Sequence, residues 1–221
     1  MTNPSHIPKK DIEKHTIDLI QAYEKESGGP IRPPVPVFDI IEYLGYDIDF
    51  RSDGFYQDPN NLGGLHIDEK LVVINEKISG QEGRMNFTAA HEVGHIRLHV
   101  PDLIKNKKKD TIMCRNIDEN IKSKRDPKEV EADMFAAYLL MPSKEVRSSF
   151  FRMNKKPFDL SKKRFIDLFR KPQTKRQKGV RIANKIIEIG NFDNVSRLAM
   201  LNRLIGLGLI RGLGYQKAIG V

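Results

Sequence analysis

The stretch His91-Glu92-Val93-Gly94-His95 matches the pattern H-E-x-x-H and guides the interpretation of the whole sequence. On a helix, side chains four residues apart project from one face about one turn apart, so His91 and His95 can both reach one ion. Glu92 cannot lie between them as a further ligand, but it lies beside the ion, where it can accept a proton from a bound water. The pattern predicts a zinc site with Glu92 as general base, although two histidines on the surface of a helix would give the same letters.

A third metal ligand is expected from a second helix, because a catalytic zinc usually has three protein ligands and one open position. This helix is predicted to begin at Asp126-Pro127 and carries Glu129 and Asp133 four residues apart on one face. We assign Glu129 as the third ligand, and expect Asp133 to accept a hydrogen bond from the non-coordinating nitrogen of one histidine. Glu131 points across the helix and is expected to be exposed, although a helix rotated by one register would exchange the two glutamates.

His99 lies one further helical turn beyond His95. At a rise of about 1.5 Å per residue it is roughly 6 Å further along the axis, so a rigid helix cannot bring three successive turns onto one ion. His99 is also too close to His95 for the longer zinc motif with three histidines. We therefore expect a structural role for His99.

The segments around the motif predict a mixed α+β fold. Apolar residues at helical spacing, with glycine and proline at the ends, predict helices over 10–26, 38–44, 81–98 and 127–141. Alternating apolar residues predict strands at 46–50, Leu62–Asp68 and Leu71–Asn75, the last two forming a hairpin. Residues 100–125 are polar and Lys-rich, and are expected to form an irregular loop.

The C-terminal part of the chain is predicted to be a second, all-helical region. We place the boundary between residues 1–142 and 143–221. Helices are expected over 143–153, 161–170, 178–189 and 194–205, separated by Pro157, Pro172 and Gly190.

The two regions differ strongly in charge. Residues 1–142 hold 19 Lys and Arg against 24 Asp and Glu, a net charge of −5, whereas residues 143–221 hold 19 against 5, a net of +14. Such asymmetry raises the question of nucleic acid as a partner, whose phosphates Arg197 and Arg203 could contact. A basic region could equally dock on an acidic protein surface, or be a solvated face without a dedicated partner.

The sequence also indicates where the protein resides. Its single cysteine, Cys114, excludes a disulfide within the chain and favours a reducing compartment. The N-terminus is polar and unlike a secretory signal, and the apolar runs are far shorter than the roughly 20 residues that span a bilayer. We expect a cytoplasmic protein without a membrane partner.

Two longer stretches, 86–99 (NFTAAHEVGHIRLH) and 129–142 (EVEADMFAAYLLMP), resemble the ImmA/IrrE family of bacterial metallopeptidases. The resemblance covers roughly residues 30–142. It implies a minimal zincin-like domain, similar to thermolysin, in which a small twisted sheet packs on the two motif-bearing helices. The zinc ligands that it implies are His91, His95 and Glu129, with Glu92 as the catalytic carboxylate.

The resemblance further implies a substrate: a transcriptional repressor of the helix-turn-helix type, whose cleavage induces stress or mobile-element genes. The C-terminal segment 194–210 is similar to a family segment that packs as a helix-turn-helix-like unit, which we place near 178–210. The Lys-rich stretch 100–125 is longer than in a compact member of the family.

Several alternatives stay open at this stage. An extended substrate would add a strand to the edge of the sheet, for which Leu62–Asp68 is our candidate. His66, Tyr56 or Tyr138 could stabilise the oxyanion by chemistry alone. The metal could be Mn²⁺ or Fe²⁺ in place of Zn²⁺. The chain could also be a non-catalytic module that binds DNA or a repressor through its basic helices.

Overall fold

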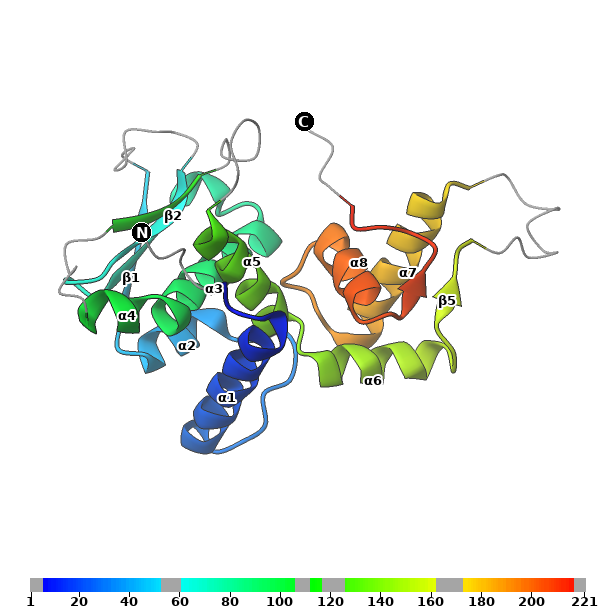
Figure 1. Ribbon diagram of the computed structural model, residues 1–221, viewed down its shortest axis with the longest axis horizontal. Coiled ribbons are helices and arrows are strands. Elements are labelled where there is room, and N and C mark those ends of the chain that lie inside the picture. The colour runs from blue at the N-terminus through cyan, green and yellow to red at the C-terminus, as the bar shows by residue number, and fades with distance from the viewer. Residues whose placement is uncertain (1–5, 53–60, 106–111, 117–125, 162–172, 217–221) are drawn as a thin grey trace. The chain divides into compact units, whose positions relative to one another are not determined.

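A computed structural model of the chain describes residues 6–52, 61–105, 112–116, 126–161 and 173–216, with the backbone alone described over 112–116. The chain divides into two compact units (Figure 1). The N-terminal unit consists of residues 1–31 and 35–140, and the C-terminal unit of residues 32–34 and 141–221.

The N-terminal unit is an α+β domain. Its helices are α1 (Lys9–Ser27), α2 (Val37–Tyr43), α3 (Glu82–Leu98), α4 (Val100–Lys105) and α5 (Pro127–Leu140), with a 3-10 turn at Glu76–Ile78. Its strands are β1 (Asp47–Arg51), β2 (Asn61–His66), β3 (Leu71–Asn75) and β4 (Ile112–Asn116). The predicted helices at 10–26, 38–44, 81–98 and 127–141 and the three predicted strands are confirmed to within a few residues.

The four strands form one sheet in the order β1-β3-β2-β4. β1 pairs with β3 in parallel, and β2 pairs antiparallel with β3 on one side and with β4 on the other. The predicted hairpin of β2 and β3 is confirmed. The prediction that Leu62–Asp68 forms the edge is wrong, because β4 covers the side of β2 that would accept another strand.

The prediction of an irregular loop over 100–125 is also wrong in part. Residues 100–105 form α4, and Ile112–Asn116 form β4, an edge strand of the sheet. The remaining residues of this stretch lie outside the described part of the chain. The strand itself contains no lysine, but lysines at 105–109 and 122–124 flank its short apolar run and gave the whole segment the composition of a loop.

The helix α3 packs against the sheet through a glycine on β2. A Cβ atom at Gly63 would lie 2.7 Å from Cγ2 of Thr88 on α3 and 2.8 Å from the carbonyl oxygen of Val73 on β3. Both distances are well inside van der Waals contact, so Gly63 lets the helix bearing the motif lie directly on the strands. Every residue of α3 from Thr88 to Ile96 is buried.

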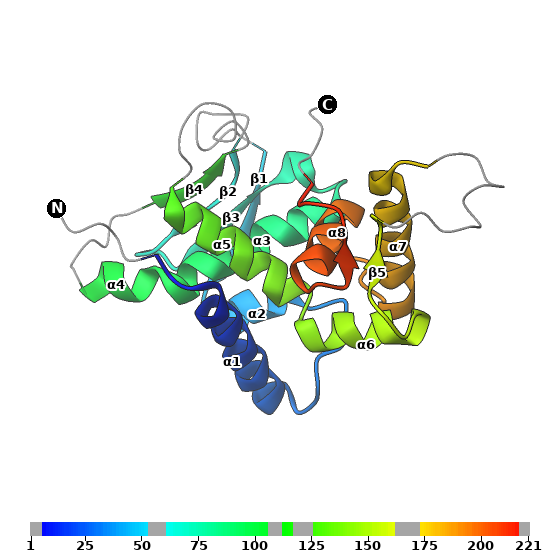
Figure 2. The same cartoon turned by 45° about the vertical axis from the view of Figure 1, so that its right-hand side comes forward.

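The two helices of the motif approach each other closely at Gly94 of α3. A Cβ atom at this position would lie 3.0 Å from Cα and 3.1 Å from the carbonyl oxygen of Ala132 on α5. Ala132 and Ala136 are fully buried, in line with the small residues expected at this contact. The close approach lets α5 lie alongside α3 (Figure 2).

The start of α5 was predicted correctly from Asp126 and Pro127. The Oδ1 atom of Asp126 accepts a hydrogen bond from the backbone N–H of Lys128 at 2.9 Å, which satisfies one of the free donors of the first turn. Pro127, the first helical residue, has no N–H to satisfy. This cap fixes the turn that carries Glu129.

The C-terminal unit is helical apart from one short pair of strands. It contains α6 (Ser143–Met153), α7 (Lys175–Gly190) and α8 (Arg197–Gly206), while β5 (Phe158–Asp159) and β6 (Ile210–Arg211) pair in parallel. The helix α6 has its predicted bounds, and α8 starts three residues later than predicted. The helix α7 starts three residues earlier than predicted, behind a capping box at Thr174. The predicted helix over 161–170 lies almost entirely outside the described residues.

Arg203 is not available for a phosphate contact. Its side chain is 6% exposed, and its Nε atom donates a hydrogen bond to the carbonyl oxygen of Met141 at 2.9 Å. This arginine therefore ties α8 to Met141, two residues before α6, and the prediction that its side chain could meet a phosphate is wrong. Arg197, at the start of α8, is exposed.

Among the described residues, none of the helices is long and apolar enough to cross a membrane.

Candidate metal centre

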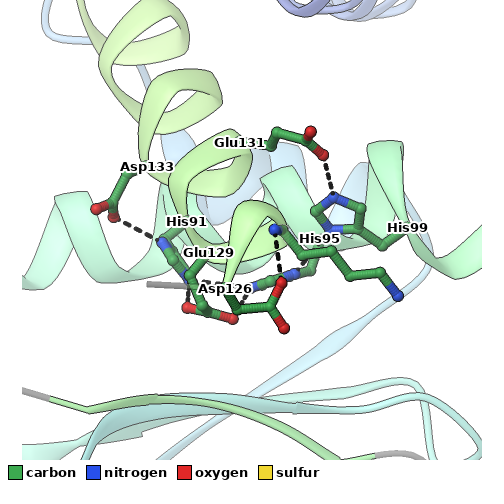
Figure 3. A network of polar contacts seen from close by, with 8 residues as sticks. His91, His95, His99, Asp126, Glu129, Glu131 and Asp133 are labelled. Carbon is green, nitrogen blue, oxygen red and sulfur yellow. Dashed lines mark hydrogen bonds and ion pairs between the residues drawn. The ribbon is translucent and has the colours of Figure 1, made fainter. Parts of the chain in front are cut away.

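Three side chains from α3 and α5 converge on one point of the N-terminal unit. The Nε2 atoms of His91 and His95 are 2.9 Å apart, and they lie 3.0 and 3.2 Å from the two carboxylate oxygens of Glu129 (Figure 3). All ligating atoms of the three residues lie within 4.8 Å of one another. The sequence named these three residues, and the structure brings them together.

The electrostatics of the three residues suit a metal site. Burial lowers the pKa of His95 to about 4, more than the neighbouring Glu129 raises it. The ring is therefore neutral at pH 7, with a lone pair available for an ion. Burial would raise the pKa of Glu129, but the imidazoles of His91 and His95 beside its two oxygens outweigh burial and hold this pKa far below its usual range. Glu129 is therefore a carboxylate.

Asp133 contacts His91 on the ring nitrogen that does not face the other ligands. Its Oδ1 atom lies 2.9 Å from Nδ1 of His91, the ring nitrogen that faces away from Glu129. This carboxylate accepts the Nδ1–H proton and so leaves Nε2 of His91 as the unprotonated, ligating nitrogen. The sequence left open which of the two histidines Asp133 would contact.

His95 is supported by a different residue, His99. The Nδ1 atoms of the two rings are 2.9 Å apart, and Nε2 of His99 lies 3.1 Å from Oε2 of Glu131. Burial lowers the pKa of His99, although hydrogen bonding to Glu131 opposes this change. His99 points away from the point where the ligands converge, as the spacing along the helix requires.

The expectation that Glu131 is exposed is wrong. The residue is 3% exposed, and its Oε1 atom lies 2.9 Å from Nδ1 of His6 and 2.8 Å from the backbone nitrogen of Ile7. Glu131 does point across α5 from Glu129, but the N-terminal segment and His99 cover that side. The sequence held no local signal for this arrangement, because His6 is 125 positions away.

Glu92 is fully buried on α3, immediately after His91. At about 100° per residue, its side chain is directed roughly 60° around the helix from that of His95, on the flank of the ligand face. A buried carboxylate beside two ligands is the arrangement that the H-E-x-x-H pattern predicts for a general base.

The three residues considered for stabilising the oxyanion lie in different places. Tyr138 lies nine residues after Glu129, on the opposite face of α5 and about 13 Å along its axis, so it is not at the centre. His66 is buried at the end of β2, with its Nδ1 atom 4.0 Å from Glu69. Tyr56 lies outside the described residues.

Two imidazoles and a carboxylate are the donor set that borderline divalent ions such as Zn²⁺ prefer. Since they converge from two rigid helices, with support behind both rings, the residues present fit a metal ion. The described part of the chain holds no second group of His, Cys, Asp and Glu that meets the same test.

The comparison with known proteins agrees with this site. The family model of the peptidase M78 family, described as the IrrE N-terminal-like domain, matches residues 48–169. No curated protein matches the chain. The matched residues begin in β1, continue through both ligand-bearing helices, and make up more than half of the chain. The resemblance to the ImmA/IrrE family is confirmed: the chain belongs to the M78 family of peptidases with an IrrE N-terminal-like domain.

Proposed function

We propose that the chain is a zinc-dependent endopeptidase whose metal is held by His91, His95 and Glu129. The observation that supports this proposal best is the convergence of two Nε2 atoms and one carboxylate within 4.8 Å. Two histidines and a glutamate on two helices are the ligands of catalytic zinc in several peptidases, where a fourth position stays open. Mn²⁺ or Fe²⁺ would also bind such ligands.

The residues of the chain have separate tasks in this proposal. A bound Zn²⁺ supplies Lewis acidity, which lowers the pKa of water and polarises the scissile carbonyl. Glu92 accepts the proton of the attacking water and then delivers it to the leaving amine. Asp133 holds His91 with Nε2 unprotonated, and His99 does the same for His95 through Nδ1.

We propose a helix-turn-helix repressor as the substrate, on the strength of the family to which the chain belongs. The substrate would bind as an extended strand, since a sheet edge offers unpaired backbone groups to such a peptide. The strand β4 is now our candidate for that edge, because its outer side carries no strand among the described residues. Cleavage of the repressor would release the genes that it controls.

Two measurements on purified full-length protein test the proposal. Metal content should be close to one ion per chain in the wild type and in Glu92→Gln, and should be lost in His91→Ala and Glu129→Ala, since each removes a ligand. Incubation with a repressor encoded beside this chain should give a single cleavage in the wild type. Glu92→Gln should lower the rate by about 10²–10⁴-fold, the usual contribution of a general base. Cleavage by Glu92→Gln at the wild-type rate would remove Glu92 from the mechanism.

A second candidate function is a non-catalytic module that binds DNA or a repressor through the C-terminal unit. The helix α7 favours it: Lys178, Arg181 and Lys185 recur at a spacing of three and four residues on one helix face. Retardation of DNA by the full chain at low salt, with affinity falling steeply as salt rises, would support this function. A chain that cleaves the repressor but does not retard DNA would exclude DNA binding.

A further inference from the structure

Glu131 is a buried carboxylate that the proposed mechanism does not use. It lies on α5 between Glu129 and Asp133, but its side chain points to the other side of the helix. There its carboxylate lies 3.1 Å from Nε2 of His99 (Figure 3). It also lies 2.9 Å from Nδ1 of His6 and 2.8 Å from the backbone nitrogen of Ile7. A carboxylate at 3% exposure needs such donors, because an unpaired buried charge is strongly unfavourable.

The proton positions in this series of hydrogen bonds follow from Glu131. At one end, Glu131 as a carboxylate only accepts, so Nε2 of His99 carries a proton and donates it. A neutral His99 ring then has an unprotonated Nδ1, which accepts from Nδ1–H of His95 at 2.9 Å. This leaves Nε2 of His95 unprotonated, and Nε2 is the atom that faces Glu129 and His91.

We infer that Glu131 is a positioning residue for the ligand His95, which it orients through His99, and that the N-terminal segment at His6–Ile7 fixes Glu131 for this task. The inference rests on the proposed metal site. The two histidine ligands are then supported in different ways. Asp133 contacts His91 directly, from the same helix that supplies Glu129. His95 depends on a carboxylate one ring further away, which is held in turn by residues that precede α1.

Glu131→Gln tests this role with little change in volume. A glutamine has only one acceptor oxygen, so it cannot accept from His99 and also from His6 and Ile7 on its two sides. We expect zinc affinity, measured by competition with a chelator, to fall about 10-fold, at the lower end of the effect of removing a residue behind a ligand. In the metal-free protein, the amide hydrogen of Ile7 should exchange faster. Glu26→Gln removes the same charge from an exposed site on α1 and should change neither value.

The measurements separate positioning from a purely structural role. A Glu131→Gln protein that unfolds at lower temperature but binds zinc within two-fold of the wild type would overturn the inference. Metal-free ¹⁵N NMR gives a readout independent of zinc: His95 should carry its proton on Nδ1 in the wild type, and the variant should populate the other tautomer as well. Unchanged tautomers in the variant would also overturn it. If the wild type bound no divalent ion at all, the proposed function would fail, and the positioning role with it.

His6→Ala serves if Glu131→Gln does not fold. The ring of His6 is largely exposed, with 59% of its side-chain surface accessible, so its removal leaves the packing of the core intact. One donor to Glu131 is lost, and zinc affinity should fall by about two- to five-fold, less than for a change behind the ligand itself. A His6→Ala protein with wild-type zinc affinity and unchanged exchange at Ile7 would overturn the part assigned to the N-terminal segment.

Discussion

The two units of the molecule place their polar groups in different ways. Among the described residues of the N-terminal unit, the buried polar and charged ones are Thr16, Asn61, His66, Asn86, Thr88, His91, Glu92, His95, His99 and Glu131. In the C-terminal unit the described residues include only Ser149, Asn194 and Arg203 in this class, although residues 143–221 carry a net charge of +14.

The two units therefore differ in what stabilises them. Buried charges are unfavourable unless they are paired, so the N-terminal unit gives up part of the stability of its core to hold a reactive group of side chains. Apart from Arg203, the described charged residues of the C-terminal unit are not buried, and its helices are stabilised by an apolar core and by caps such as those at Thr174 and Ser196. The conditions that act on buried ionisable groups should therefore affect the first unit and spare the second.

Metal addition should produce the largest difference in stability between the two units. Zinc at about 1,000 times its dissociation constant stabilises the state that binds it by about 4 kcal/mol. We expect the slowest-exchanging amides of α3 and α5 to gain this protection, while those of α7 and α8 stay unchanged. Hydrogen exchange with and without a chelator measures both in one sample. Equal protection of the two units would mean that they unfold together.

The second-largest effect is expected from acid, which should destabilise the N-terminal unit of the metal-free protein. The pKa of His95 is about 4 in the folded protein, against an ordinary value of 6.5, so the unfolded chain takes up a proton at higher pH than the folded one. The stability is fully present above about pH 6.5 and is lost as the pH falls toward 4. The lowered pKa of Glu129 acts in the same direction at lower pH.

We expect a loss on the order of 3 kcal/mol between pH 7 and pH 4. Urea unfolding of the metal-free protein at several pH values, followed by exchange in each unit, measures it. The variant His95→Gln should show a flatter pH profile. A profile as steep as that of the wild type would assign the loss to other groups.

Gly94→Ala should have a smaller effect on stability, and it should destabilise the protein where such a change usually stabilises. Inside a helix this change ordinarily stabilises by about 1 kcal/mol. Here the added Cβ atom would lie 3.0 Å from Cα of Ala132, and overpacking of this kind costs about 1–3 kcal/mol. We expect a net destabilisation of about 1 kcal/mol and weaker zinc binding, since α5 must move away with Glu129.

Gly80→Ala is the matched control for this change. A Cβ atom at Gly80 meets nothing within 4 Å, so its stability and zinc affinity should match the wild type. Thermal unfolding of both variants with and without zinc makes the comparison. A more stable Gly94→Ala protein would show that the two helices are not in tight contact at this position.

The smallest effect is expected for the double change Arg181→Gln and Lys185→Gln on α7. Both side chains are exposed and make only surface contacts, to Gln173 and Glu188. Stability should change by less than about 0.5 kcal/mol, and zinc affinity should not change. Binding to a repressor or to DNA is the property that would respond. If binding is unchanged as well, this face of α7 is a solvated surface.

The sequence predicted the parts of the site that depend on local patterns. The spacing of His91 and His95, the cap at Asp126 and the position of Glu129 in the first turn each follow from the geometry of one helix. The environment of Glu131 does not, because its partners His99 and His6 lie on other elements.

The sheet shows the same limit. The alternation of the β2–β3 hairpin was visible, but the edge was misplaced, since it depends on pairing between β2 and Ile112–Asn116 across a Lys-rich segment. Arg203 was misread for a similar reason. Its charge indicated the surface, and only the fold shows the carbonyl of Met141 to which it is bound.

Glu129 lies in the first turn of α5. It is the third residue of the helix, where the free N–H groups and the helix dipole favour a negative charge. The helix dipole thus acts together with the two imidazoles to keep this carboxylate ionised before any ion arrives. An incoming cation meets a preorganised set of donors, so little conformational entropy is lost on binding, and ions of similar charge and size should exchange at the centre without refolding.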